Sequence, residues 1–259
     1  MSATGPNRFT FEQFLNVRTA HSASFSPDGT QLTFLSDISG VAEVWSVPVS
    51  VYSATPAWPQ QLTFRGERNS TARFSPAGDV LLITGDTGGA ERTQFFLVRP
   101  DGTGFTPLTD RPEVIYQFGD WSADGRRICY ASNERDARYF DIYEREIIIG
   151  SDAADLSLTE PRRIYQHDGT NSAVNYSPDG KFILIERTES NTRNALLLVD
   201  IATGEARRLT PEIDAGPAEH SHVHWSADGA GLYLLSNRGR QFLSLAYLDI
   251  ATTDLIYLR

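Results

Sequence analysis

Ser26-Pro27-Asp28-Gly29 is the stretch that decides the fold, because the sequence contains it five times in related form. The other copies are Ser75-Pro76-Ala77-Gly78, Ser122-Ala123-Asp124-Gly125, Ser177-Pro178-Asp179-Gly180 and Ser226-Ala227-Asp228-Gly229. Their glycines stand at 29, 78, 125, 180 and 229, so successive copies are 49, 47, 55 and 49 residues apart. A period of about 50 residues in a chain of short strands is typical of β-propeller blades.

The residues around each copy repeat as well. Four residues before each glycine stands an aromatic residue: Phe25, Phe74, Trp121, Tyr176 or Trp225. Apolar residues follow three and five positions after it: Leu32 and Phe34, Leu81 and Ile83, Ile128 and Tyr130, Ile183 and Ile185, and Leu232 and Leu234. These two positions share one face of a strand, because side chains alternate with a period of two. Asp-Gly between two such runs predicts a hairpin whose glycine takes a positive φ.

Each unit also contains a third and a fourth apolar run. The third strands are predicted at Val44–Val47, Phe95–Val98, Phe140–Tyr143, Leu196–Val199 and Leu245–Leu248. Shorter fourth strands are predicted to end in Leu62-Thr63, Leu108-Thr109, Ile164-Tyr165, Leu209-Thr210 and Tyr257-Leu258. We therefore predict an all-β propeller of four-stranded antiparallel blades at about 20–66, 67–112, 113–167, 168–212 and 219–259. A lead-in, residues 1–19, precedes them, and its segment Phe9–Val17 is predicted to be a strand or, slightly favoured, a short helix.

Closure of the ring is the open question about this fold. A closed propeller usually shares a strand between its first and last blades, which leaves no open edge. The regular order of strands leaves only Phe9–Val17 over. We expect an incomplete propeller of seven or eight blades, cut at a blade boundary; the alternative is a closed ring of five blades.

Composition limits the function classes. The 259 residues carry a net charge of −10, which argues against a nucleic-acid partner, since such partners require a basic face. Cys129 is the single cysteine, so no disulfide within the chain can form. No signal peptide and no apolar run of about 20 residues is visible, so we expect no membrane contact and a cytoplasmic location.

Motifs of common enzymes are missing from the sequence. No serine lies in a Gly-x-Ser-x-Gly nucleophile elbow, and no phosphate-binding Gly-x-x-x-x-Gly-Lys occurs. Gly102-x-Gly104 lacks the third glycine of a dinucleotide fingerprint. We expect this chain to hold no catalytic residue and no cofactor.

His220, His222 and His224 form the sharpest local cluster. Alternate spacing on a strand would place all three imidazoles on one face, where they could bind Zn²⁺ together with Asp228. Neighbouring imidazoles would lie about 6–7 Å apart, however, and the matching positions of the other blades show no ligand pattern. Polar lining or packing between blades is the preferred interpretation; a pH-sensitive contact is the other alternative, and no metal is expected.

Three carboxylates of the chain could form an acid–base pair. Asp120 on an inner strand, with Glu113 and Glu219 in preceding loops, offers the main candidates for chemistry of the glycosidase kind. Asp28, Asp124, Asp179 and Asp228 lie in the repeated turns. A structural use is the preferred interpretation of these acids.

The loops between second and third strands differ most from blade to blade. They are predicted at 37–42, 85–93, 133–139, 187–194 and 237–241, at the same end as the connections 110–114 and 211–219. Loops on a rigid scaffold often carry recognition, so Arg92, Glu134, Arg135 and Arg138 are candidate contacts with a peptide or a partner domain. The alternative is a solvated charged rim.

Trp121-Ser122-Ala123-Asp124-Gly125, followed by Ile128 to Asn133 and by Phe140-Asp141-Ile142-Tyr143, resembles the TolB-type, WD-like propeller repeat. The resemblance covers roughly residues 20 to 259. With Gly88-Gly89-Ala90-Glu91-Arg92-Thr93-Gln94-Phe95 and the long lead-in, the chain looks most like the N-terminal propeller of the prolyl-oligopeptidase family of serine peptidases, including acylaminoacyl- and dipeptidyl-type members.

This resemblance implies a parent protein with an α/β-hydrolase domain and a Ser-Asp-His triad after the propeller. The propeller of such proteins has seven or eight blades, covers the active site and contributes to peptide selection. The present sequence contains no part of that hydrolase domain, so no catalytic residue can be carried over to it.

Three functional hypotheses follow. The leading one is a non-catalytic propeller segment that gates a prolyl-oligopeptidase-like peptidase, with the hydrolase domain and peptide substrates as its partners. The second is a stand-alone TolB-like scaffold for other proteins, closed by itself or as a homo-oligomer. The third is a channel enzyme or metal protein that uses His220, His222 and His224.

Overall fold

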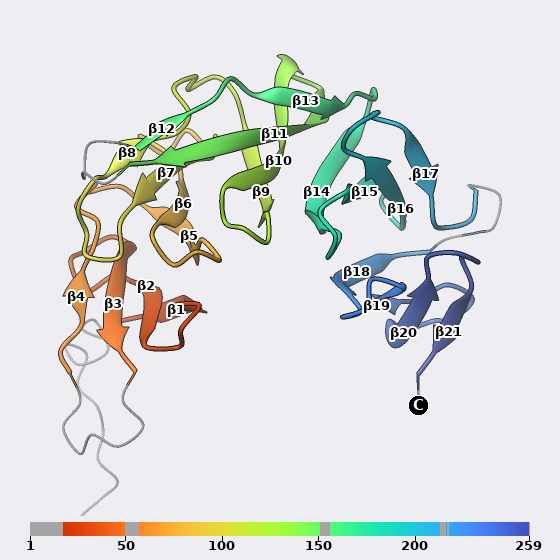
Figure 1. Cartoon of the computed structure of the whole chain (residues 1–259), viewed down its shortest axis with the longest axis horizontal. Helices are drawn as coiled ribbons and strands as arrows, with labels where there is room; N and C mark the ends of the chain where they lie inside the picture. Colours follow the sequence, from red (N-terminus) through yellow and green to blue (C-terminus); the bar gives the residue numbers. More distant parts are fainter. Residues whose placement is uncertain (1–17, 50–56, 151–155, 213–215, 217, 259) are drawn as a thin grey trace, which may run out of the picture.

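The described residues form five antiparallel sheets, arranged one after another in an arc (Figure 1). The computed structural model of the chain describes residues 18–49, 57–150, 156–212, 216 and 218–258. The predicted all-β propeller fold is thereby confirmed, with each sheet as one blade. Segment Phe9–Val17 lies outside the described residues. No helix in the described part of the chain is long and apolar enough to cross a membrane.

Four of the five blades have four strands in sequential order. Blade one contains β1 (Ala20–Phe25), β2 (Gln31–Ser36), β3 (Glu43–Pro48) and β4 (Gln60–Gln61). Blade two contains β5 (Asn69–Phe74), β6 (Leu81–Gly85), β7 (Gln94–Val98) and β8 (Thr106–Pro107). Blade four contains β14 (Thr170–Tyr176), β15 (Phe182–Ser190), β16 (Arg193–Asp200) and β17 (Ala206–Arg208). Blade five contains β18 (His220–Trp225), β19 (Gly231–Ser236), β20 (Ser244–Asp249) and β21 (Leu255–Tyr257).

Blade three has a fifth strand. It contains β9 (Tyr116–Trp121), β10 (Arg127–Asp136), β11 (Tyr139–Ile149), β12 (Leu156–Leu158) and β13 (Arg162–Tyr165). The long β11 pairs with β13 through its first half and with β12 through Ile147, Ile148 and Ile149. Ile147 and Leu156 pack into the core between blades two and three, so this arm binds blade three to its neighbour. The arm accounts for the wider spacing of 55 residues that follows blade three's turn.

The first strand of each blade lies on the concave side of the arc (Figure 1). These inner strands are β1, β5, β9, β14 and β18, and they form the wall that faces the centre. Blades one and five stand at the two ends of the arc. Among the described strands, none of blade one pairs with one of blade five.

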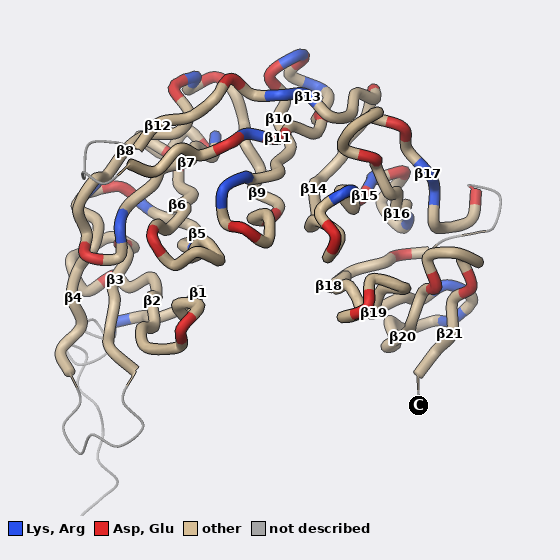
Figure 2. The backbone as a smooth tube through the Cα atoms, in the orientation of Figure 1, with Lys and Arg blue, Asp and Glu red and all other residues tan. Residues whose placement is uncertain are grey.

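The repeated turns are built by local hydrogen bonds. Ser26 Oγ donates to Asp28 Oδ1 at 2.6 Å, and the amide of Gln31 donates back to Ser26 Oγ at 2.9 Å. Gly29 takes a φ of 70°, which glycine adopts without a Cβ clash. The serine and neighbouring backbone hydrogen bonds lower the pKa of Asp28, and of Asp124, Asp179 and Asp228 in the same way. Acidic residues accordingly mark these turns along the chain (Figure 2).

Apolar side chains fill the space between consecutive blades. The core between blades two and three, for example, contains Leu82, Phe95 and Leu97 from one side and Tyr116 and Tyr130 from the other. Similar clusters join blades one and two, three and four, and four and five. Burial of such surfaces contributes about 25 cal/mol per Å², so the blades stabilise one another in a series.

The outer strands are shorter than predicted. In blades one, two and four they end at Gln61, Pro107 and Arg208, immediately before the predicted Leu-Thr pairs. The leucine amide still donates to the third strand in each of these blades, and the threonine hydroxyl then replaces a backbone acceptor. Thr63 Oγ1, for instance, accepts from the amide of Val44 at 2.9 Å. The side chain thus closes the ladder where the backbone turns away.

Two predicted loops are mostly strand. In blade three, β10 runs to Asp136 and β11 begins at Tyr139, so the segment 133–139 is a tight hairpin. In blade four, β15 runs to Ser190 and β16 begins at Arg193, so 187–194 is another. Polar residues continue these strands beyond the packed core, which is why the sequence pattern alone indicated loops there.

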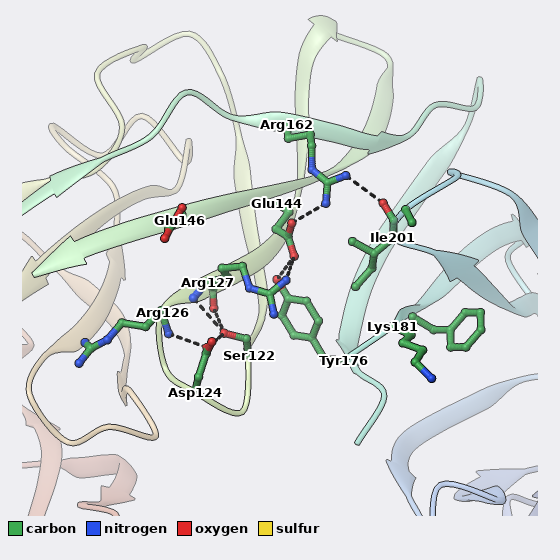
Figure 3. A network of polar contacts seen from close by, with 12 residues as sticks. Ser122, Asp124, Arg126, Arg127, Glu144, Glu146, Arg162, Tyr176, Lys181 and Ile201 are labelled. Carbon is green, nitrogen blue, oxygen red and sulfur yellow. Dashed lines mark hydrogen bonds and ion pairs between the residues drawn. The ribbon is translucent and has the colours of Figure 1, made fainter. Parts of the chain in front are cut away.

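A buried carboxylate couples blades three and four (Figure 3). Glu144 on β11 accepts from Arg127 at 3.1 Å, from Arg162 at 2.7 Å and from the Tyr176 hydroxyl at 3.1 Å. Arg162 also donates to the carbonyl of Ile201 at 2.9 Å, in blade four. Burial, with the nearby Cys129 and Glu144, raises the pKa of Tyr176. The network fixes the two blades in one orientation.

Candidate binding site on the inner strands

One position of the repeat on the inner strands is polar in all five blades. Five residues before each turn glycine, this position carries Ser24, Arg73, Asp120, Asn175 and His224. Asp120 lies within the electrostatic influence of both Arg73 and His224, from blades two and five, and each of these lowers its pKa. The fold therefore gathers side chains that are about 50 to 150 residues apart in the sequence around Asp120.

A cavity of about 400 Å³ lies beside Asp120, between the inner strands of blades two and three. Its charged lining residues are Arg73 and Asp120. Its other lining residues are Thr71, Phe74, Pro76, Thr84, Thr93, Tyr116, Gln117, Phe118, Gly119 and Trp121. The cavity thus combines aromatic rings with hydroxyl and amide groups, a composition that suits a small polar ligand.

Asp120 is held in place by the backbone. Its Oδ1 accepts from the amide of Trp121 at 2.8 Å, which fixes the carboxylate on the strand. Burial raises the pKa of Asp120, opposed by this hydrogen bond and by Arg73 and His224. A partly desolvated carboxylate in a cavity gains from a cationic partner more than one in bulk water does.

Gly119 allows the close approach that positions Asp120. A Cβ at this residue would lie 2.7 Å from Ala173 Cβ and 2.8 Å from the Ala173 carbonyl oxygen. Strand β9 can therefore lie against β14 only without a side chain here.

The three histidines do not share a face, contrary to the arrangement that regular alternate spacing would give. The pairing of β18 with β19 shifts register between Ser221 and His224, and His222 has a φ of 52°. This β-bulge leaves His220 buried and His222 and His224 exposed. Among the described residues, no group of three or more His, Cys, Asp or Glu side chains is placed to hold a metal ion.

His220 is instead a buried residue between blades four and five. Its side chain is 1% exposed, and neither ring nitrogen has a hydrogen-bond partner in the described structure. Burial, together with Arg238, Arg193 and Arg208, lowers its pKa to about 4. The imidazole is therefore neutral near pH 7.

Two of the four rim candidates, Arg135 and Arg138, hold the hairpin of blade three. Arg135 donates to both oxygens of buried Asp141, at 2.6 and 3.1 Å, and to Asp168 at 3.0 Å. These carboxylates raise the pKa of Arg135. Arg138 is exposed, pairs with Asp136 at 2.8 Å and lies over the ring of Tyr139 at 4.8 Å.

The other two rim candidates, Arg92 and Glu134, are linked through a chain of contacts. Arg92 donates to the carbonyl of Glu113 at 2.6 Å, and Arg111 bridges Glu113 at 3.0 Å and Glu134 at 2.9 Å. Glu113 therefore belongs to the rim; neither it nor Glu219 lines the cavity beside Asp120. The considered pair of carboxylates does not converge there.

Arg73 is the residue that the sequence interpretation missed. It occupies the same repeat position as Asp120, so the alignment of the five units held the necessary signal. The set at this position looked merely polar because its members differ in charge. Only the folded structure, in which residues of β5 and β9 line the same cavity, brings these two opposite charges together.

The sequence is similar to curated peptidases. It is 27% identical over 232 residues to dipeptidyl aminopeptidase BIII of Pseudoxanthomonas mexicana, covering 88% of this chain and 31% of that protein. It is 25% identical over 217 residues to the uncharacterized peptidase YuxL of Bacillus subtilis strain 168, covering 82% and 29%. The chain thus spans about a third of the length of these relatives. No family model matches the sequence.

Solved structures share the fold at low identity. The putative TolB of Agrobacterium tumefaciens superimposes with a TM-score of 0.63 at 18% identity, covering 93% of this chain and 81% of that one. A puromycin-hydrolyzing peptidase of Mycobacterium tuberculosis gives 0.68 at 15% identity, covering 93% and 38%. A prolyl endopeptidase gives 0.65 at 14% identity, covering 92% and 34%. The chain therefore has a TolB-like all-β propeller fold, is similar in sequence to a dipeptidyl aminopeptidase, and is similar in fold to part of a puromycin-hydrolyzing peptidase and of a prolyl endopeptidase, in agreement with the predicted resemblance.

Proposed function

We propose that this chain is the non-catalytic propeller segment of a serine peptidase, where it gates access to the active site and contributes a wall that contacts the peptide. The observation that carries the proposal is the match to dipeptidyl aminopeptidase BIII, which extends over 88% of this chain but only 31% of that protein. The sequence has no Gly-x-Ser-x-Gly elbow, so the hydrolytic residues would come from another domain.

The concave wall supports a role toward peptides. The cavity beside Asp120 offers hydroxyl groups, an amide and aromatic rings within one site of about 400 Å³. Groups of this kind bind backbone amides and apolar side chains together. A propeller placed over an active site would present this wall to peptides on their way in or out.

Two experiments test this proposal: an activity assay on the purified chain and sequencing of the parent reading frame. The purified protein should not hydrolyse aminoacyl- or dipeptidyl-nitroanilides, and the parent reading frame should encode a Gly-x-Ser-x-Gly segment after Arg259. Turnover by the chain alone that a serine-reactive inhibitor abolishes would refute the non-catalytic role. A reading frame without a hydrolase segment would refute the peptidase assignment.

A second candidate is a scaffold that binds other proteins. Blade five favours it, because its outermost face exposes Tyr233, Leu245 and Leu258 to 44%, 51% and 41%. Exposed apolar patches of this kind mark sites of association. This scaffold would need no hydrolase domain, so the reading frame downstream separates the two candidates.

A further inference from the structure

The cavity between β5 and β9 holds two opposite charges that form no direct ion pair among the described residues. Arg73 and Asp120 both line it, yet no ion pair joins them in the described structure. The Arg73 side chain is exposed, and no hydrogen bond or ring contact engages its guanidinium among the described residues. Asp120 accepts a hydrogen bond from the Trp121 amide through Oδ1. The cavity wall therefore carries one positive and one negative group.

This pair of charges selects the ligand class. A simple cation attracted by Asp120 would be repelled by Arg73 and by any charge on His224, which also acts on Asp120. A simple anion at Arg73 would be repelled by Asp120. A zwitterion satisfies both, because its ammonium can lie at the carboxylate and its carboxylate at the guanidinium.

The other residues that line the cavity, and the cavity volume, restrict the class of ligand further. The hydroxyls of Thr71 and Thr84 bond to each other at 2.8 Å, and Gln117 contributes an amide, so groups that can bind a peptide unit line the same cavity as the two charges. Phe118 and Trp121 supply aromatic surface for an apolar side chain. A cavity of about 400 Å³ falls within the range of about 300–1,000 Å³ found for small-ligand sites.

We propose that this cavity binds short free peptides of dipeptide size through both of their termini, with the ammonium at Asp120 and the carboxylate at Arg73. The interior of a longer peptide carries neither terminal charge and lacks this recognition. The site is thus selective for chain length, and it would hold small peptides on the concave wall whether they are products or effectors of a larger protein.

Calorimetric titration of the purified chain with glycyl-phenylalanine tests the proposal. Saturable binding of one dipeptide per chain is expected, and N-acetylation or C-terminal amidation of the dipeptide should each weaken it about tenfold, because each removes a charge-assisted contact. Asp120→Asn keeps the shape and should weaken the free dipeptide about tenfold without affecting the N-acetylated one. Arg73→Gln should weaken binding of the free dipeptide about tenfold and leave binding of the C-terminally amidated dipeptide unaffected.

The hairpin of blade three offers a matched control. Arg138→Gln and Asp136→Asn remove an exposed arginine and its partner carboxylate outside the cavity, and they should leave binding unchanged. Circular dichroism confirms that each variant is folded. Absence of binding by the folded chain, equal binding of the doubly blocked dipeptide, or unchanged binding in Asp120→Asn and Arg73→Gln would each overturn the proposal. Dipeptide binding is measured on this chain alone, so a negative binding result would not bear on the proposed peptidase role. The reading-frame test, in turn, does not bear on whether the cavity binds dipeptides.

Discussion

His220 shows how a single buried residue makes stability depend on pH. Its pKa is lowered to about 4 in the folded chain, whereas an unfolded histidine has a pKa of about 6.5. Between about pH 6.5 and pH 4 the imidazole of His220 is therefore protonated in the unfolded state but neutral in the folded state. Stability from this residue is fully present above pH 6.5 and falls as the pH drops toward 4, by up to about 3 kcal/mol.

The repeat itself suggests the substitution that removes this effect. Asn69 and Asn171 occupy the same repeat position in blades two and four, and their amides donate to the carbonyls of Ala42 and Phe140 at 3.0 and 2.8 Å. His220→Asn should therefore fit. Urea unfolding at pH 7 and at pH 4.5 should show a loss of stability that is about 2 kcal/mol smaller than in the wild type.

His222→Asn is the control for this prediction, since His222 lies two residues away on the same strand and is exposed. It should leave the pH dependence as it is in the wild type. If His220→Asn loses as much stability on acidification as the wild type does, then a group other than His220 carries the effect.

The same strand shows where sequence reasoning about single residues stops. The turn residues Ser26, Asp28 and Gly29 were predictable, because serine, aspartate and glycine each satisfy a specific need of that turn. The bulge at His222 was not, because one extra residue in a strand leaves no compositional mark. A spacing of two therefore predicted a shared face that the backbone does not provide.

At the scale of elements, Glu144 joins strands of two blades. It is 6% exposed and accepts hydrogen bonds from Arg127, Arg162 and Tyr176. Glu144→Gln keeps the size but leaves two guanidinium groups without their counter-charge. We expect the free energy of unfolding to fall by about 2 kcal/mol, less than for a fully buried pair, because both arginines are partly exposed.

Glu146→Gln provides the matched control for this prediction. Glu146 lies two residues further along β11 and is exposed, and among the described residues its carboxylate forms no hydrogen bond or ion pair with the network (Figure 3). Its substitution should change stability by less than about 0.5 kcal/mol. Thermal or urea unfolding of both variants at pH 7 measures the difference. Equal stability of the two variants would mean that the network does not hold blades three and four together.

The strands that pack into the core of each blade could be predicted from the sequence. The four apolar runs of each blade carry the period-two pattern, so their sheets could be assigned from sequence. The arm formed by Ile147–Ile149 and Leu156–Leu158 could not, because a second pairing partner for one long strand is a tertiary choice. The spacing of 55 residues is wider than the other spacings, but it does not show that the extra residues pack against blade two.

At the scale of the whole molecule, the same repeat position has different surroundings inside the arc and at its end. Leu245 in blade five corresponds to Val44, Phe95, Ile142 and Leu196, as the strand registers show. Those four are buried to within 1% exposure, whereas Leu245 is 51% exposed. Tyr233 and Ile256 lie on the same face, at 44% and 58%. Blade five thus presents to solvent a surface that each of the other blades covers with its neighbour.

This exposed face should make the chain associate with itself. Light scattering over a range of concentrations should show a mass that rises above that of one chain, and Leu245→Arg should shift the protein toward the monomer. The substitution should cost little folding stability, because the side chain is already half in water. Phe95→Arg, at the equivalent position inside the arc, buries a charge without a partner and should unfold the chain. Association through this face depends on the burial of its apolar side chains. A wild type that stays monomeric at every concentration, with Leu245→Arg indistinguishable from it, would show that this face does not drive association.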